Sequence, residues 1–168
     1  ASLGLAISLV SLELRVLIGG NITVEDPSFL EMAAHVMAWL GAAYGLMYRQ
    51  RLFSSFVSLW GARILLAVSL VAIVFFSCGV FNPVFTNEPL QGNVVFNALL
   101  LAFLAPAILI ALIALRSEAL GLGNLRMPLG LVSLALGMIY VTLQTKRVFQ
   151  GRLMELPSYS NGEFYAYS

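Results

Sequence analysis

The stretch VSLWGARILLAVSLVAIVFFSCGVF, residues 57–81, decides the class of this protein. It is apolar almost throughout, and Arg63 is its only charged residue. A helix needs about 20 consecutive, mostly apolar residues to cross a bilayer. Inside a bilayer only helices and closed barrels hydrogen-bond their whole backbone. Because the run is continuous rather than alternating, it predicts a transmembrane helix and not a barrel strand.

Apolar runs of the same kind lie on both sides of this stretch, at residues 1–18, 29–48, 94–115 and 127–149. A sixth run begins near Gly162 and continues to the end of the sequence. We therefore expect an all-α fold, a polytopic transmembrane bundle of five to six helices, with residues 1–168 forming one helical region. Since the chain begins and ends inside apolar runs, we expect it to be part of a longer polytopic protein. Its partners would be the lipid bilayer and the remaining helices of that protein.

The composition supports this class. Hydrophobic residues make up 60% of the chain and charged residues 10%, with a mean hydropathy of +0.93. A soluble domain has roughly a quarter of its residues charged. The net charge of +1 gives no electrostatic basis for binding nucleic acid. The single cysteine, Cys78, can form neither an internal disulfide nor a thiolate metal site.

Positive charges indicate an orientation. Cytoplasmic connections are enriched in Lys and Arg, and arginines flank the second and fourth predicted connections, whereas the third, residues 82–93, contains none. We therefore expect the second and fourth connections in the cytoplasm. Three cations in and around the fifth connection favour the opposite orientation: Lys146, Arg147 and Arg152.

Two decapeptides share one layout. SLELRVLIGG, residues 11–20, aligns without a gap with TLQTKRVFQG, residues 142–151. The alignment pairs Ser11 with Thr142, Glu13 with Gln144, and Arg15 with Lys146. An apolar composition alone does not produce such polar matches, so we interpret them as a duplication, with one copy at 1–130 and a second beginning at 131–168. Because the copies are separated by an even number of helices, the repeat would be parallel.

The second decapeptide carries a family resemblance. TLQTKRVFQG resembles a recurring helix end, Leu-Glu-Val-Arg-Arg followed by Phe-His-Gly, of the bacterial membrane proteins catalogued as domain of unknown function 2339. FNPVFTNEPLQGNVVFNALLLAFLAP, residues 81–106, is similar to a loop-and-helix signature of the same family. Gly19 and Gln150 stand where the motif has histidine. The resemblance implies a multi-pass protein of the bacterial inner membrane and no known reaction.

Six charged residues are placed where predicted helices meet their connections. We expect them to form structural ion pairs at the membrane interface, where long side chains can reach water. Arg15 would approach Glu31 or Glu13, and Lys146 or Arg147 would approach Glu163.

Two further polar residues could instead line an internal path. Glu31 and His35 lie four residues apart on one helical face, which fits either a proton relay or a helix start at the interface. Asn97 could cap its helix, bond across helices or contact a solute. Pro106 should kink the fourth helix by removing a backbone hydrogen bond. The small residues of GAAYG, 41–45, should form a close helix contact within the chain.

The sequence contains no catalytic motif, cofactor motif or metal cluster that we can identify. Three function classes remain. The first is a non-catalytic scaffold or cell-envelope component. The second is a transporter of a small or lipid-linked solute, and the third is a membrane enzyme whose site lies outside this chain.

Overall fold

The computed structural model describes residues 2–19, 28–52, 56–80, 97–118 and 120–150. Within these residues every regular element is a helix. The elements, in chain order, are α1 (Ser2–Gly19), α2 (Phe29–Leu52), α3 (Phe56–Ala72), the π-helix η1 (Ile73–Val80), the π-helix η2 (Leu100–Leu104), α5 (Ala105–Leu115), the 3₁₀-helix η3 (Gly123–Leu125) and α6 (Arg126–Gln150). The described part of the chain is thus all-α, as predicted, with five helical segments.

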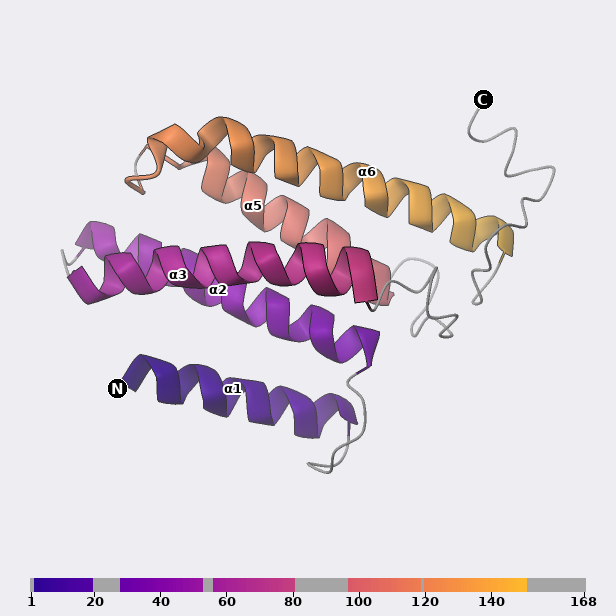
Figure 1. Ribbon diagram of the computed structural model, residues 1–168, viewed down its shortest axis with the longest axis horizontal. Helices are drawn as coiled ribbons and strands as arrows, with labels where there is room; N and C mark the ends of the chain where they lie inside the picture. The colour runs from indigo at the N-terminus through magenta and orange to yellow at the C-terminus, as the bar shows by residue number, and fades with distance from the viewer. Residues whose placement is uncertain (1, 20–27, 53–55, 81–96, 119, 151–168) are drawn as a thin grey trace.

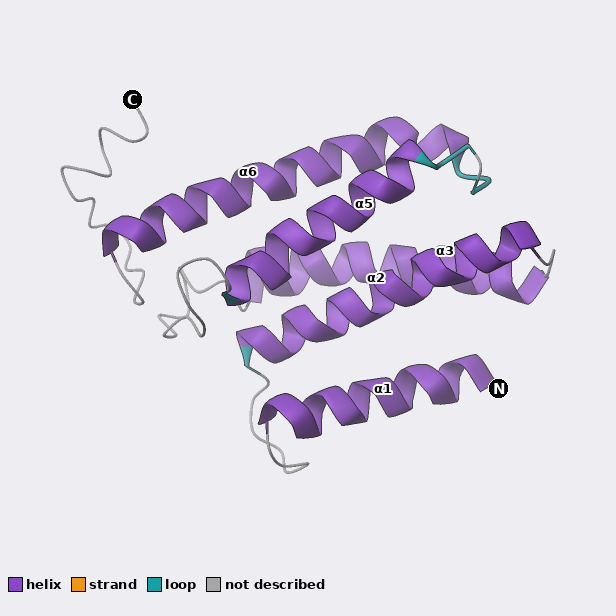
Figure 2. Ribbon diagram, turned by 180° about the vertical axis from the view of Figure 1, so that it is seen from behind, coloured by secondary structure: helices purple, strands orange, loops and turns teal. Residues whose placement is uncertain are grey.

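Consecutive segments run in alternating directions (Figure 1). The end of α1 and the start of α2 therefore lie at one end of the bundle, together with the start of η2 and the end of α6. The opposite end holds the end of α2, the start of α3, the end of α5 and the start of α6, as the reverse view also shows (Figure 2). We call the first the α1–α2 end and the second the arginine end, after Arg49, Arg116 and Arg126.

Helix α2 is the centre of the bundle. It packs against α1, α3, η2 and α5, and α5 in turn packs against α6. Small residues occupy many of the contacts, which lets the helix backbones approach one another closely. Those that are buried include Ala33, Ala43, Ala62, Ala98, Ala102, Ala107 and Ala114. Larger side chains fill the remaining space, and the Phe29 and Phe103 ring centroids lie 6.3 Å apart.

Among the described residues, two helices are long and apolar enough to cross a membrane by length and composition, at Phe56–Phe76 and Gly123–Phe149. A shorter apolar helix spans Leu100–Leu115. Their outer faces carry large apolar side chains, among them Ile64 and Val71 on α3 and Leu134 on α6. This exposed apolar surface is the kind that a membrane or another protein covers.

Three local expectations are corrected or refined. Helix α2 continues to Leu52 through the predicted connection at 49–51, because Arg and Gln are good helix formers. Pro106 is buried in the first turn of α5, directly after η2, a position where the N–H that proline lacks has no acceptor within the α-helix. In GAAYG the buried residue is Ala43, whereas Gly41 and Gly45 are exposed with open space around them, so the two glycines do not make the expected contact within the described residues. The predicted sixth helix lies outside the described residues.

Candidate functional site

The first polar cluster begins with the start of α2. Ser28 directly precedes the helix, and its Oγ accepts a hydrogen bond from the Glu31 backbone N–H at 3.2 Å. Serine in this position satisfies one of the free N–H groups at a helix start. Glu31 lies in the first turn, where the helix dipole favours a negative charge. Its residue exposure is nevertheless only 6%, so its carboxylate needs a partner.

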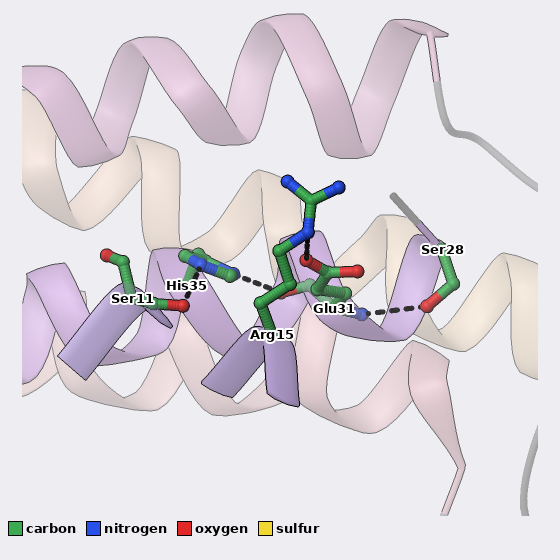
Figure 3. A network of polar contacts seen from close by, with 5 residues as sticks. All are labelled: Ser11, Arg15, Ser28, Glu31 and His35. Atoms are coloured by element: carbon green, nitrogen blue, oxygen red, sulfur yellow. Dashed lines mark hydrogen bonds and ion pairs between the residues drawn. The ribbon is translucent and has the colours of Figure 1, made fainter. Parts of the chain in front are cut away.

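That partner comes from α1. Arg15 Nε lies 3.9 Å from Glu31 Oε1, and the two side chains point towards each other between the helices (Figure 3). The Arg15 side chain is 33% exposed and the Glu31 side chain is 8% exposed. The arginine thus reaches from the surface to a nearly buried carboxylate. Glu13, two residues before it on α1, is exposed.

His35 joins the same two helices through their backbones. Its Nδ1 lies 2.8 Å from the carbonyl oxygen of Glu31, and its Nε2 lies 3.1 Å from that of Ser11 (Figure 3). A carbonyl oxygen can only accept a hydrogen bond. A neutral imidazole has one N–H and donates to one of these oxygens, whereas an imidazolium donates to both. The Nδ1 contact lies within α2, whereas the Nε2 contact joins α2 to α1 when Nε2 carries a proton, as in the imidazolium and in one neutral tautomer.

The second polar cluster joins η2 to α6. Asn97 Nδ2 donates to Gln144 Oε1 at 2.9 Å, and Asn97 Oδ1 accepts from the Leu100 backbone N–H at 2.9 Å. One side chain therefore caps the helical segment that follows it and bonds across to α6. Asn97 is buried, so its amide groups depend on these partners.

Two cations lie close to this contact in the sequence. Lys146 and Arg147, in the last turns of α6, are 8% and 5% exposed. Cations are favoured at a helix C-terminus, where the dipole is negative. Their predicted partner Glu163 lies outside the described residues, so the expected pairing stays a prediction.

Both clusters lie at the α1–α2 end of the bundle. Helices α1 and α6 run in the same direction (Figure 1), so the two aligned decapeptides place their polar residues at the same end. In the first copy these residues contact α2, and in the second Gln144 contacts Asn97, upstream of η2. The structure thus joins Arg15 to Glu31. His35 contacts the backbone carbonyl oxygens of Glu31 and Ser11. Asn97 bonds to the Gln144 side chain and to the Leu100 backbone N–H.

The polar contacts seen in the two clusters run between helices or within a helix start. Among the described residues, no group of three or more His, Cys, Asp or Glu side chains is placed to hold a metal ion. The sequence interpretation missed Ser28 and Gln144 as partners. The spacing Ser28-x-x-Glu31 at the start of an apolar run is the signal that identifies the cap. Gln144 gives no comparable signal, because its partner is remote in the sequence.

Comparison with known proteins gives one match. A family described as "Predicted membrane protein (DUF2339)" matches residues 1–168. No curated protein matches, and no solved structure matches.

Proposed function

Because the chain belongs to the predicted membrane protein family DUF2339, we propose that it is a multi-pass, non-catalytic scaffold of the bacterial inner membrane. The observation that carries this proposal is the use of its polar side chains. In the described helices, several of them link one helix to the next. Polar groups in a bilayer are favoured where they bond across helices, so this use fits a structural element of an envelope assembly.

The cross-helix bonds reach each major helix contact. His35 and Arg15 link α1 and α2, and Ser58 Oγ donates to the Leu46 carbonyl oxygen between α3 and α2 at 3.1 Å. Arg116 at the end of α5 donates to the Tyr44 hydroxyl of α2. Ser133 Oγ on α6 donates to the Ala107 carbonyl oxygen on α5 at 2.8 Å.

The transmembrane arrangement is part of the same proposal. Alternating helix directions, two long apolar helices and a broad exposed apolar surface support a bundle that crosses the bilayer several times. The arginine end would face the cytoplasm by the positive-inside rule. The exposed faces of α1, α3 and α6 would contact lipid or further helices of a longer protein.

A parallel duplication is also proposed. Its support is the shared direction of α1 and α6 and the polar residues that both decapeptides bring to one end (Figure 1). The rest of the second copy, residues 151–168, lies outside the described residues. A structure in which 162–168 ran in the same direction as α6 would contradict the duplication, because the corresponding helix α2 runs opposite to α1.

Cysteine accessibility tests the scaffold against a transporter. Cys78 is the only cysteine, so Cys78→Ser provides a background for single cysteines. Ala33→Cys and Ala98→Cys place thiols at buried positions that are close to Glu31, His35 and Asn97 along the chain, with 1% and 2% exposure. In a scaffold, a membrane-impermeant maleimide should modify neither from either side of a sealed membrane. Asn124→Cys, at an exposed position at the arginine end, should be modified from the cytoplasmic side and serves as the control.

A solute path lined by His35 and Asn97 gives a different outcome. Water must then reach these residues, and the thiols at positions 33 and 98 should react from at least one side. If an added solute changes the rate at which these thiols react, the scaffold proposal is contradicted and transport is supported.

A further inference from the structure

A groove near the arginine end, away from both polar clusters, has the features of a lipid site. Helix α3 packs mainly against α2, and α6 mainly against α5. The groove between α3 and α6 has a volume of about 720 Å³. Its walls are largely apolar and include Leu66, Leu70, Leu122, Leu129 and Val132. An apolar groove of this size suits the acyl chains of an amphiphile.

The polar part of the groove is confined to one end. Arg63 is the one charged residue among its lining residues. Its Nη2 donates to the Gly121 carbonyl oxygen at 3.3 Å, while its buried Nε has no hydrogen-bond partner in the described structure. A buried N–H of a guanidinium without an acceptor is costly. Because the Arg63 side chain also lines the groove, an anionic oxygen bound there would supply the guanidinium with an acceptor.

The backbone around Arg63 leaves room for a headgroup. The turn from Gly121 to Asn124 lines the same end of the groove. Gly121 has a φ of 69°, which residues with a Cβ rarely adopt, and a Cβ added there would meet no atom within 4 Å. The space beside Gly121, the residue whose carbonyl oxygen Arg63 contacts, is therefore open.

The charge around the groove selects the headgroup. Arg49, Arg116 and Arg126 lie at the same end of the bundle, and Glu118 is the one acid among the described residues there. Glu118 is already paired with Arg126 at 3.4 Å. The remaining positive charge is complementary to an anionic lipid, which cytoplasmic leaflets contain.

We propose that the α3–α6 groove binds an anionic phospholipid, with its phosphate at Arg63 and its acyl chains along Leu66, Leu70 and Val132. Arg63 would donate to a phosphate oxygen through a charge-assisted hydrogen bond. The chains would follow the apolar walls towards the middle of α3 and α6. This site rests on the proposed transmembrane arrangement with the arginine end at the cytoplasmic side, but not on whether the bundle is a scaffold or a transporter.

Trp60 provides a local probe. It is 48% exposed, and the Arg63 guanidinium carbon lies 5.9 Å from its ring centroid. The protein has two tryptophans, and Trp39 Nε1 has no hydrogen-bond partner among the described residues. Trp39→Phe therefore loses no bond that is seen there and leaves Trp60 as the only tryptophan.

The experiment measures quenching of Trp60 by brominated lipids. Trp39→Phe protein is reconstituted in phosphatidylcholine vesicles that contain the same mole fraction of brominated phosphatidylglycerol or brominated phosphatidylcholine. Both lipids carry a phosphate that can accept from Arg63, but phosphatidylcholine also carries a cation that the arginines repel, so the anionic lipid should be favoured by about tenfold in relative affinity. Arg63→Gln should remove this preference. Arg49→Gln, which removes an exposed charge at the same end outside the groove, should keep it.

A second variant and a second ligand complete the test. Ala67→Phe fills the groove without changing charge and should also remove the preference, so the test stands even if Arg63→Gln does not fold. Excess inorganic phosphate should not compete. The proposal would be overturned if both lipids quench Trp60 equally, or if Arg49→Gln and Arg63→Gln lose the lipid preference to the same extent. It would also be overturned if Ala67→Phe keeps the preference, or if inorganic phosphate competes.

Discussion

Replacing Arg15 with methionine is expected to lower the free energy of unfolding by about 2–3 kcal/mol. Methionine keeps much of the apolar stem and removes the charge, so the loss reports the ion pair rather than the packing. Glu31 would then remain as a nearly buried carboxylate without its cation. The expected loss lies between the values for buried and for surface pairs, because the Arg15 side chain is 33% exposed and the contact spans 3.9 Å.

The measurement is SDS-titration unfolding of the purified protein in detergent micelles. Glu13→Gln is the matched control, because it removes an exposed charge from the same helix and should change stability by less than about 0.5 kcal/mol. Glu31→Gln should cost less than Arg15→Met, since the remaining arginine is partly exposed and can turn to water. Equal, small effects of all three changes would mean that the ion pair contributes nothing to holding α1.

Replacing Asn97 with alanine is expected to lower the free energy of unfolding by about 2–4 kcal/mol. Losing the cap on the Leu100 N–H accounts for about 1 kcal/mol. Losing the bond to Gln144 in a buried setting accounts for about 1–3 kcal/mol more. These two terms act on different elements, the start of η2 and the contact with α6, so they can be separated.

Asn97→Ser and Gln144→Leu make that separation by the same unfolding measurement. Serine can still cap the helix but is too short to reach Gln144, whereas Gln144→Leu keeps the cap and removes the contact. Each of these two variants should lower the free energy of unfolding by part of the amount expected for Asn97→Ala. Asn124→Ala, at an exposed asparagine, should lose less than about 0.5 kcal/mol. An Asn97→Ala loss no larger than the Asn124→Ala loss would contradict the assigned role.

The helices were predictable from the sequence because length and apolar composition decide them locally. The runs at 57–81 and 127–149 became α3 with η1 and α6 because each is long, apolar and bounded by polar or glycine-rich residues. The end of α2 was not predicted, because arginine was interpreted as a marker of a connection although it is also a good helix former.

The site was only partly predictable. Arg15, Glu31, His35 and Asn97 are conspicuous as polar residues in apolar surroundings. Which of them meet depends on how helices remote in the sequence pack, as with Asn97 and Gln144. The sequence identified Arg63 only as a charged residue in an apolar run. Its position beside an apolar groove depends on how α3 and α6 are placed relative to each other, which the sequence does not show.

The central claim is that the charged residues at the α1–α2 end hold helices together, and exchanging one charge pair tests it most directly. Arg15→Glu alone should lower the free energy of unfolding by more than Arg15→Met, because it places two carboxylates side by side. Adding Glu31→Arg should recover part of the loss and not all of it, since a cation is unfavourable in the first turn of α2. A harmless Arg15→Glu, or a double variant less stable than the single one, would contradict the claim.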